Sequence, residues 1–407
     1  MSNMKRTNGT SPLAKAAALG VAVLAFASGQ QADATPLGRK QALRMYERLT
    51  GTPPSATLLL TLEGMVGNSS QAELEATAAF IMDPDQGHSK NFYSVTLKNF
   101  ATPWTNRDQS IFAPLNDYTA TVIGLVKEDA DFRTVLFDDV VFIGSGSGIP
   151  AYSPTSNAHY EALESNSVDL RTLTRTTQSS LNGLPPAATA GVITSRAASE
   201  AFFIDGTNRA MFRFTLMNHM CRDMEQIHDT SRPPDRIRQD VSRSPGGDSS
   251  VFNNNCIGCH SVMDSMAQAF AYYDFDETLG RLVYTPGQVQ PKYLINSDNF
   301  KPGYVTPDDG WENRMRLDGK NDIGVLGWDE NRPNHGNGAK SLGQEFAYSN
   351  AFAECQTEKV FRKVCFRGPT DAELGPGGAF QTISTTFKSA GSLRGVFAQV
   401  AAQCAGQ

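Results

Sequence analysis

The pentapeptide Cys256-Ile257-Gly258-Cys259-His260 constrains this chain of 407 residues more than any other feature of its sequence. The pattern C-x-x-C-H is the attachment signature of c-type haem. On one short helix the two thiols can form thioether bonds with the two vinyl groups of a single porphyrin, and His260 then lies under the iron as its proximal ligand. The pattern occurs once, so we expect one covalently bound haem c, attached through Cys256 and Cys259.

The N-terminus predicts export. Lys5, Arg6 and Lys15 form a positive region, residues 16–27 are a short apolar run, and residues 32–34 (Ala-Asp-Ala) form a small-residue cleavage site. This order is typical of a secretory signal peptide that is cut near Ala34. The alternative is an uncleaved membrane anchor. The apolar run is shorter than the roughly 20 residues of a membrane-spanning helix. We therefore expect a periplasmic or secreted protein with no membrane span in the mature chain.

The rest of the sequence disfavours other uses of the motif. A zinc site needs about two further ligands in a compact pattern, and no second C-x-x-C and no H-x-x-x-H occurs. The formal net charge is −6 and no basic tract is present, so nucleic acid is not an expected partner. The expected partner is a second redox protein.

The spacing of apolar residues predicts a mainly α fold, in which helical modules with long loops wrap around one covalently attached c-type haem. Helices are expected at residues 35–49, 71–82 and 350–366. Residues 280–345 are rich in Gly, Pro, Asn and Asp, which predicts loops with short strands around the cofactor. The expected segments are a signal peptide at 1–34, an N-terminal helical domain at 35–185, a c-type haem domain at 186–345 and a C-terminal helical module at 346–407.

Two capping patterns indicate where helices begin. Ser249 or Ser250 can cap the helix that carries the haem cysteines. The sequence from Thr370 to Glu373 is a capping-box pattern, which predicts a further helix near the C-terminus.

The sixth ligand of the iron would decide between functions, and the sequence leaves it open. Met263 and Met266 follow the motif on the proximal helix and cannot readily reach the opposite face of a haem. Met315 lies downstream in a loop-rich stretch, where small class I cytochromes commonly place their distal methionine, so it is the tentative distal ligand. His219 is the alternative, although a lone histidine on an apolar helix face is more often a hydrogen-bonded core residue. An open site and three weaker options also remain: His159, His228 and His335.

Four cysteines lie outside the motif, and an even remainder in an exported protein predicts two disulfides unless they stay as buried thiols. If residues 350–366 form one helix, Cys355 and Cys365 are about 15 Å apart at its rise per residue. That separation exceeds the roughly 7 Å between Cα atoms that a disulfide allows. We expect Cys355 to pair with Cys404 and Cys221 with Cys365. The alternative exchanges the partners.

The segment around the motif, CIGCHSVMDSMAQAFAYYDFDETLGR, resembles the C-x-x-C-H-x-x-M-D…F-x-x-x-D…G-R segment of large cytochrome-c-like proteins of planctomycetes and some proteobacteria, whose modules carry domain-of-unknown-function labels. Residues 190–222, the stretch AFAECQTEKVFRKVCFRGPTDAEL and, loosely, RMYERLTGTPPS are similar to other parts of that group. The resemblance implies a mostly helical, exported monohaem cytochrome with haem attached at Cys256 and Cys259 and iron bound by His260. Many members have Pro after the M-D pair, where this chain has Ser265 after Asp264. A nearby prolyl carbonyl, which often orients the proximal histidine in small cytochromes, is thus not expected at that position.

Two classes of function follow from these features. An iron closed by two protein ligands would make the chain an exported monohaem c-type cytochrome that transfers single electrons, and this is the function that we expect. An open distal site would make it a haem enzyme, peroxidase- or oxidase-like, with a substrate pocket formed with the N-terminal domain. The long segment before the motif is more than a simple carrier needs, which keeps the second class open. The sequence favours a carrier over a catalyst and identifies no catalytic residue.

Overall fold

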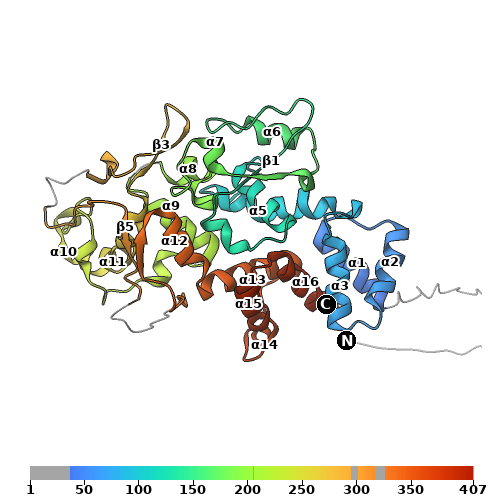
Figure 1. Cartoon of the computed structure of the whole chain (residues 1–407). Helices are drawn as coiled ribbons and strands as arrows, with labels where there is room; N and C mark the ends of the chain where they lie inside the picture. The colour runs from blue at the N-terminus through green and yellow to red at the C-terminus, as the bar shows by residue number, and fades with distance from the viewer. Residues whose placement is uncertain (1–36, 205, 295–300, 317–325, 407) are drawn as a thin grey trace, which may run out of the picture. The chain divides into compact units, whose positions relative to one another are not determined.

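The computed structural model of the chain describes residues 37–204, 206–294, 301–316 and 326–406, and the predicted signal peptide at 1–34 lies outside them. Helices predominate among the described residues and strands are few and short, which confirms the prediction of a mainly α protein (Figure 1). No helix in these ranges combines the length and the apolar character that crossing a bilayer requires.

Three helices open the described chain and pack on one another: α1 (Leu37–Thr50), α2 (Ala56–Val66) and α3 (Gln71–Met82). The predicted range 71–82 is therefore confirmed, and the range 35–49 is confirmed for its described part, with residues 35 and 36 outside the described residues. Prolines at 53 and 54 separate α1 from α2, because proline lacks the N–H that a continuing helix needs. The start of α3 is set by a capping box, in which Ser70 accepts from the backbone of Glu73 and the Glu73 carboxylate accepts from the backbone N–H of Ser70.

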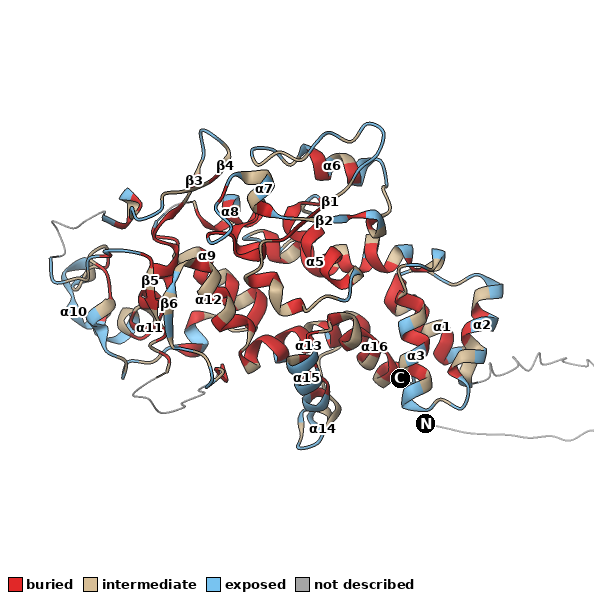
Figure 2. Ribbon diagram, viewed as in Figure 1, coloured by how far each residue is buried: buried red, intermediate tan, exposed pale blue. Residues whose placement is uncertain are grey.

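The buried helix α5 (Asp117–Lys127) is the centre of the next segment, and the structure buries it on almost every side (Figure 2). It contacts β1 at Gly124, where an added Cβ would lie 2.1 Å from the Phe142 ring, so only glycine permits this approach. The other elements of this segment are α4 (Lys98–Ala101), β1 (Val141–Ile143), α6 (Ala158–Ser165), β2 (Thr174–Thr176), α7 (Gln178–Asn182) and α8 (Arg196–Phe202).

The segment with the C-x-x-C-H motif combines short helices with two pairs of short strands. Two antiparallel strand pairs lie in this segment, β3 with β4 and β5 with β6. In the preceding segment β1 pairs with β2, also antiparallel. In the described part of residues 280–345, short strands and loops match the prediction as far as residue 337. Residues 338–345 differ from it, because they form the first turns of the helix at Gly338–Ala347. The elements are α9 (Arg209–Thr215), the π-helical turn η7 (Leu216–Met220), α10 (Ser249–Val251), the π-helical turn η11 (Phe252–Cys256), α11 (Ile257–Ala267), β3 (Tyr273–Asp276), β4 (Arg281–Tyr284), β5 (Gly310–Glu312) and β6 (His335–Asn337).

The cap of the motif-bearing helix differs from the prediction. Asp248, and neither Ser249 nor Ser250, precedes the helix, and its carboxylate accepts from the backbone N–H of Ser250 at 2.8 Å. The two serines lie inside the first turn, so they cannot act as its N-cap. The predicted capping box at Thr370 is confirmed, since Thr370 and Glu373 exchange both capping hydrogen bonds.

The C-terminal helices return to the first part of the chain. They are α12 (Gly338–Ala347), α13 (Asn350–Val364), α14 (Asp371–Leu374), α15 (Ala379–Ala390) and α16 (Leu393–Cys404). Helix α16 packs against α3 and α1, and one hydrophobic core runs from Ala42 to Ala405 through all three predicted segments of the mature chain. Residues Leu37–Gln407 accordingly cluster as one unit. The domain boundaries near residues 185 and 345 stay a prediction from the sequence.

The disulfides are Cys221–Cys355 and Cys365–Cys404, so the pairing that we expected first is wrong and its alternative is correct. Cys355 and Cys365 do not pair with each other, as their separation along α13 predicts. The direction of the closing helices explains the error. Lys388 near the end of α15 donates to Asn350 at the start of α13, so α15 runs back along α13. Helix α16 then runs parallel to α13, which brings Cys404 to the C-terminal end of α13 rather than to its middle.

We predict that the Cys365→Ala/Cys404→Ala variant loses about 4 kcal/mol of unfolding free energy, because the disulfide closes a loop of 39 residues in the unfolded chain. The measurement is urea unfolding of wild type and variant, with Cys221→Ala/Cys355→Ala as the matched comparison. The latter is expected to lose about 5 kcal/mol, since its loop spans 134 residues. Peptide mapping under non-reducing conditions that joined Cys355 to Cys404 would contradict this pairing.

Candidate haem-attachment site

The motif lies where η11 passes into α11, and a neighbouring segment covers it closely. An added Cβ at Gly258 would lie 2.4 Å from Nε2 of His228, so the middle of the motif needs a residue without a side chain. The backbone N–H of Asp229 donates to the carbonyl of Gly258 at 3.1 Å. The segment around residues 224–229 is thereby held against the first turn of α11.

The two cysteines of the motif are the free thiols of this chain, whereas the other four cysteines form disulfides. They are three positions apart in the helix, about 4.5 Å along its axis. Cys259 packs against the main core and its Sγ lies 3.6 Å from the carbonyl oxygen of Met224. Cys256 packs against a small apolar cluster of Ile237, Val241 and Phe252. Both thiols thus border apolar surface, as the vinyl-bearing edge of a porphyrin requires.

The ring of His260 is held from behind by a carboxylate. Its Nδ1 lies 3.1 Å from Oδ1 of Asp264, which is one turn further along α11. Because Asp264 is ionised, Nδ1 carries the proton and donates it, which leaves a lone pair on Nε2. Nε2 has no hydrogen-bond partner among the described residues, and 22 % of the side chain is exposed. This tautomer is the one that a metal-binding histidine needs.

Asp264 was not identified from the sequence as a site residue, and the structure makes it central. Its side chain has no exposure, and Arg209 of α9 binds both of its oxygens, at 2.7 and 2.9 Å. Burial alone would raise the pKa of Asp264, but Arg209, Arg238 and the hydrogen bond from His260 hold that pKa well below its usual range. The signal in the sequence is the spacing H-x-x-x-D, which places the two side chains on one helix face.

Met315 lies in the same part of the fold as the motif. It follows β5, which packs against α11, and its side chain is buried in the main hydrophobic core. Its backbone N–H donates to the side chain of Asn313 at 3.0 Å. The tentative distal ligand is therefore a buried, apolar-packed methionine beside the element that contacts the motif helix.

His219 lies among aromatic residues contributed by other elements. Its Nε2 is 2.6 Å from the hydroxyl of Tyr118, its ring stacks on Tyr118 and Phe352, and Trp104 meets it edge-on. Burial, with a smaller contribution from the charge of Lys359, lowers the pKa of His219 well below its usual range. This neutral histidine has the contacts of a hydrogen-bonded core residue, and Nδ1 lacks a partner among the described residues.

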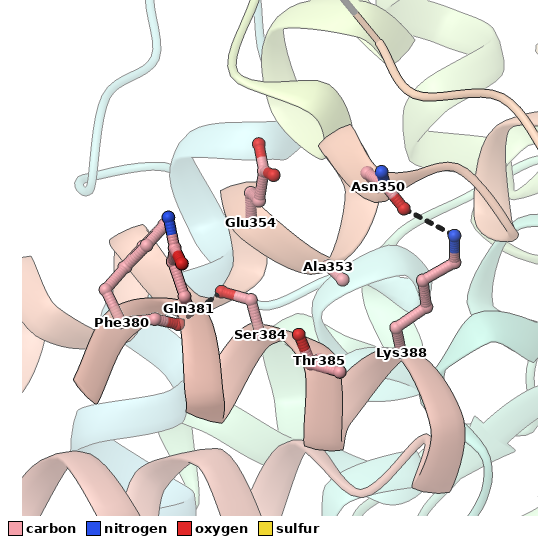
Figure 3. Close-up of a pocket in the computed structure, with 8 residues that line it drawn as sticks. All are labelled: Asn350, Ala353, Glu354, Phe380, Gln381, Ser384, Thr385 and Lys388. Carbon is pink, nitrogen blue, oxygen red and sulfur yellow. Dashed lines mark hydrogen bonds between the residues drawn. The ribbon is translucent and has the colours of Figure 1, made fainter. Parts of the chain in front are cut away.

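Two hollows in the described part of the chain differ in their distance from the motif helix. One of about 430 Å³ borders α11 and is lined by residues between 236 and 337, among them Ser265, Gln268 and Trp311, with none from the N-terminal segment. Figure 3 shows the other, of about 200 Å³, between α13 and α15. There Lys388 donates to Asn350 and the Ser384 hydroxyl donates to a backbone carbonyl of its own helix. The residues lining the second hollow therefore form no nucleophile–base pair.

Comparison of the chain with protein-family models, with curated proteins and with solved structures finds no match. The site is therefore defined by this chain's own geometry. That geometry comprises two thiols one turn apart and a histidine whose inner nitrogen is bound by a buried carboxylate.

We predict that the folded, haem-free chain has two thiols that react with an alkylating reagent, and that mass spectrometry assigns them to Cys256 and Cys259. Burial, followed by the negative charges of Glu225 and Asp223, raises the pKa of the Cys259 thiol. A smaller fraction of Cys259 is therefore thiolate at neutral pH than for an exposed cysteine, and the thiolate is the reactive form. We expect its alkylation to accelerate as the pH rises. The Cys256→Ser variant should retain one reactive thiol. Alkylation of any of the other four cysteines without reduction would contradict the prediction.

Proposed function

We propose that this protein is an exported monohaem c-type cytochrome that passes single electrons to a partner protein. The observation that carries the proposal is the division of its six cysteines. Four form disulfides, and the two that remain as thiols belong to the C-x-x-C-H sequence on one helical turn. Disulfides are usual in exported proteins, and covalent haem attachment takes place outside the cytoplasm, so the two features support each other. The resemblance of the motif segment to cytochrome-c-like proteins agrees with this function.

The residues present fit a covalently attached haem. Cys256 and Cys259 would hold the porphyrin, and Nε2 of His260 would bind the iron with Asp264 orienting the ring. The bound group would supply a one-electron Fe(III)/Fe(II) couple, with an electron entering from a donor protein and leaving to an acceptor. The chain's own contribution is to exclude water with the apolar clusters beside each thiol and to fix the histidine tautomer.

Met315 remains our proposed distal ligand. It is buried and follows β5, the strand that packs on α11, by three residues, whereas His219 is bound to Tyr118 and enclosed by aromatic rings from other elements. Methionine ligation would raise the reduction potential relative to a second histidine. A closed, six-coordinate iron of this kind suits electron transfer.

A haem enzyme with an open distal site is the second candidate, and one observation favours it. A carboxylate behind the proximal histidine makes the histidine a stronger electron donor, which favours the oxidised metal and assists reactions with oxidants. The hollow of about 430 Å³ beside α11 offers room for a small polar substrate. No catalytic residue is assigned to it.

The visible spectrum of the reduced protein, recorded before and after carbon monoxide is added, separates the two candidates. We predict a low-spin spectrum that the gas leaves unchanged, because a protein ligand occupies the sixth position. Immediate binding of carbon monoxide to a high-spin iron would instead establish the open site of the second candidate.

We predict that Met315→Leu converts the iron from low spin to high spin. Leucine matches methionine in volume, so the cost in stability should be below about 1.5 kcal/mol, while the thioether sulfur is lost. The matched control is Met220→Leu, which changes another buried methionine, on η7, and should leave the spectrum unaltered. If Met315→Leu stays low-spin, Met315 is not the ligand, and the spectrum of His219→Gln then tests the alternative.

A further inference from the structure

We propose that Asp264 is a positioning residue for the iron ligand, which acts through Nδ1 of His260 to lower the reduction potential of the attached haem. This inference rests on the proposed haem attachment at Cys256 and Cys259. It adds a specific electronic role for a carboxylate that the motif itself does not include.

The first support is the geometry within α11. His260 and Asp264 are four residues apart, so their side chains lie on the same face of the helix, and Nδ1 and Oδ1 are 3.1 Å apart. The Asp264 side chain has no exposed surface, so water cannot compete for this hydrogen bond. A buried carboxylate that accepts from Nδ1–H increases the electron density on Nε2, the atom that would bind the iron.

The second support is that other elements hold the carboxylate in place. Arg209 donates to both oxygens of Asp264, and the backbone N–H of Arg238 donates to Oδ2 at 3.2 Å. Arg209 is itself held from its other side by Asp240, at 2.6 and 2.8 Å. The Asp264 carboxylate cannot rotate away from His260 without breaking its bidentate ion pair with Arg209. The hydrogen bond to the ring is therefore preorganised.

The third support is the balance of charge in the cluster. Arg209 and Arg238 are positive and Asp240 and Asp264 are negative, and the Arg238 guanidinium also lies over the Tyr293 ring at 4.7 Å. Of the two acidic residues, Asp264 is the one that His260 contacts. Asp264 therefore combines a negative charge with a hydrogen bond to the ring, whereas Asp240 carries the charge alone. Comparing the two residues separates the effect of the charge from the effect of the hydrogen bond.

A purely structural role would be the simplest alternative. The Arg209–Asp264 pair joins α9 to α11, and breaking a buried ion pair is strongly destabilising. Such a role would change stability, and the equilibrium between ferric and ferrous iron would then respond only to the lost negative charge, to a similar extent for Asp264 and Asp240. The reduction potential is therefore the measurement that separates the two roles.

The experiment compares the Fe(III)/Fe(II) midpoint potential of the haem-loaded wild type, Asp264→Asn and Asp240→Asn by spectroelectrochemical titration. We expect Asp264→Asn to shift the equilibrium about tenfold toward Fe(II), a rise of about 59 mV for one electron. Asp240→Asn also removes one negative charge that is paired with Arg209, but Asp240 does not contact His260. The shift of the midpoint potential should therefore be clearly smaller in this variant. Asp264→Glu, which keeps the negative charge, should lie closer to wild type than Asp264→Asn. Equal shifts in the two Asn variants, or no shift in Asp264→Asn, would overturn the inference.

A measurement on the wild type covers the case in which Asp264→Asn does not fold. Redox-induced infrared difference spectra of protein labelled with ¹³C in the aspartate carboxyl group should contain a labelled carboxylate band, because the hydrogen bond from Nδ1 changes strength with the oxidation state. Absence of that band would overturn the role of Asp264. Failure of the proposed function itself has a different signature, since the mature wild type would then lack the mass and the spectrum of a covalently bound haem.

Discussion

The ion pair between Arg209 and Asp264 is the interaction on which the site depends. It joins α9 to α11, it is inaccessible to water at the carboxylate, and it positions the Asp264 oxygen that accepts from Nδ1 of His260. A buried carboxylate without a partner would be costly and would tend to take up a proton. Arg209 removes that cost, and Asp240 and Arg238 complete the cluster. The orientation of the motif histidine is therefore decided by residues from elements well separated in the sequence.

The rest of the fold supports this arrangement by covering the motif on several sides. Gly258 lets the segment around His228 lie directly against the first turn of α11, and the apolar residues next to the two thiols come from separate clusters. The core continues from there through α5 and α13 to the helices at both ends of the described chain (Figure 2). The two disulfides join the C-terminal helices to each other and to η7, in the part of the core that holds His219. The long N-terminal segment thus forms part of the same hydrophobic core as the motif helix.

Much of the local structure could be predicted from the sequence, and most of the tertiary relations could not. The helices at 71–82 and 350–364 follow from apolar periodicity and from capping residues, which act over four or five positions. The pairing of Cys404 depended on whether α16 runs parallel or antiparallel to α13, and periodicity contains no information about direction. Asp264 was visible in the sequence as an aspartate one turn after His260. Its role depends on Arg209, which lies 55 positions earlier and meets it only in the folded chain.

By itself the sequence determined that two cysteines and a histidine lie on one helical turn, because three-residue spacing and helix geometry are local properties. It also determined that the fold is mainly helical. Only the tertiary structure decided which cysteines pair, that His219 is bound to Tyr118, and that a buried carboxylate holds the inner nitrogen of His260. The physical reason is that these features arise from contacts between distant segments. Such contacts depend on how helices pack against one another, which no local pattern specifies.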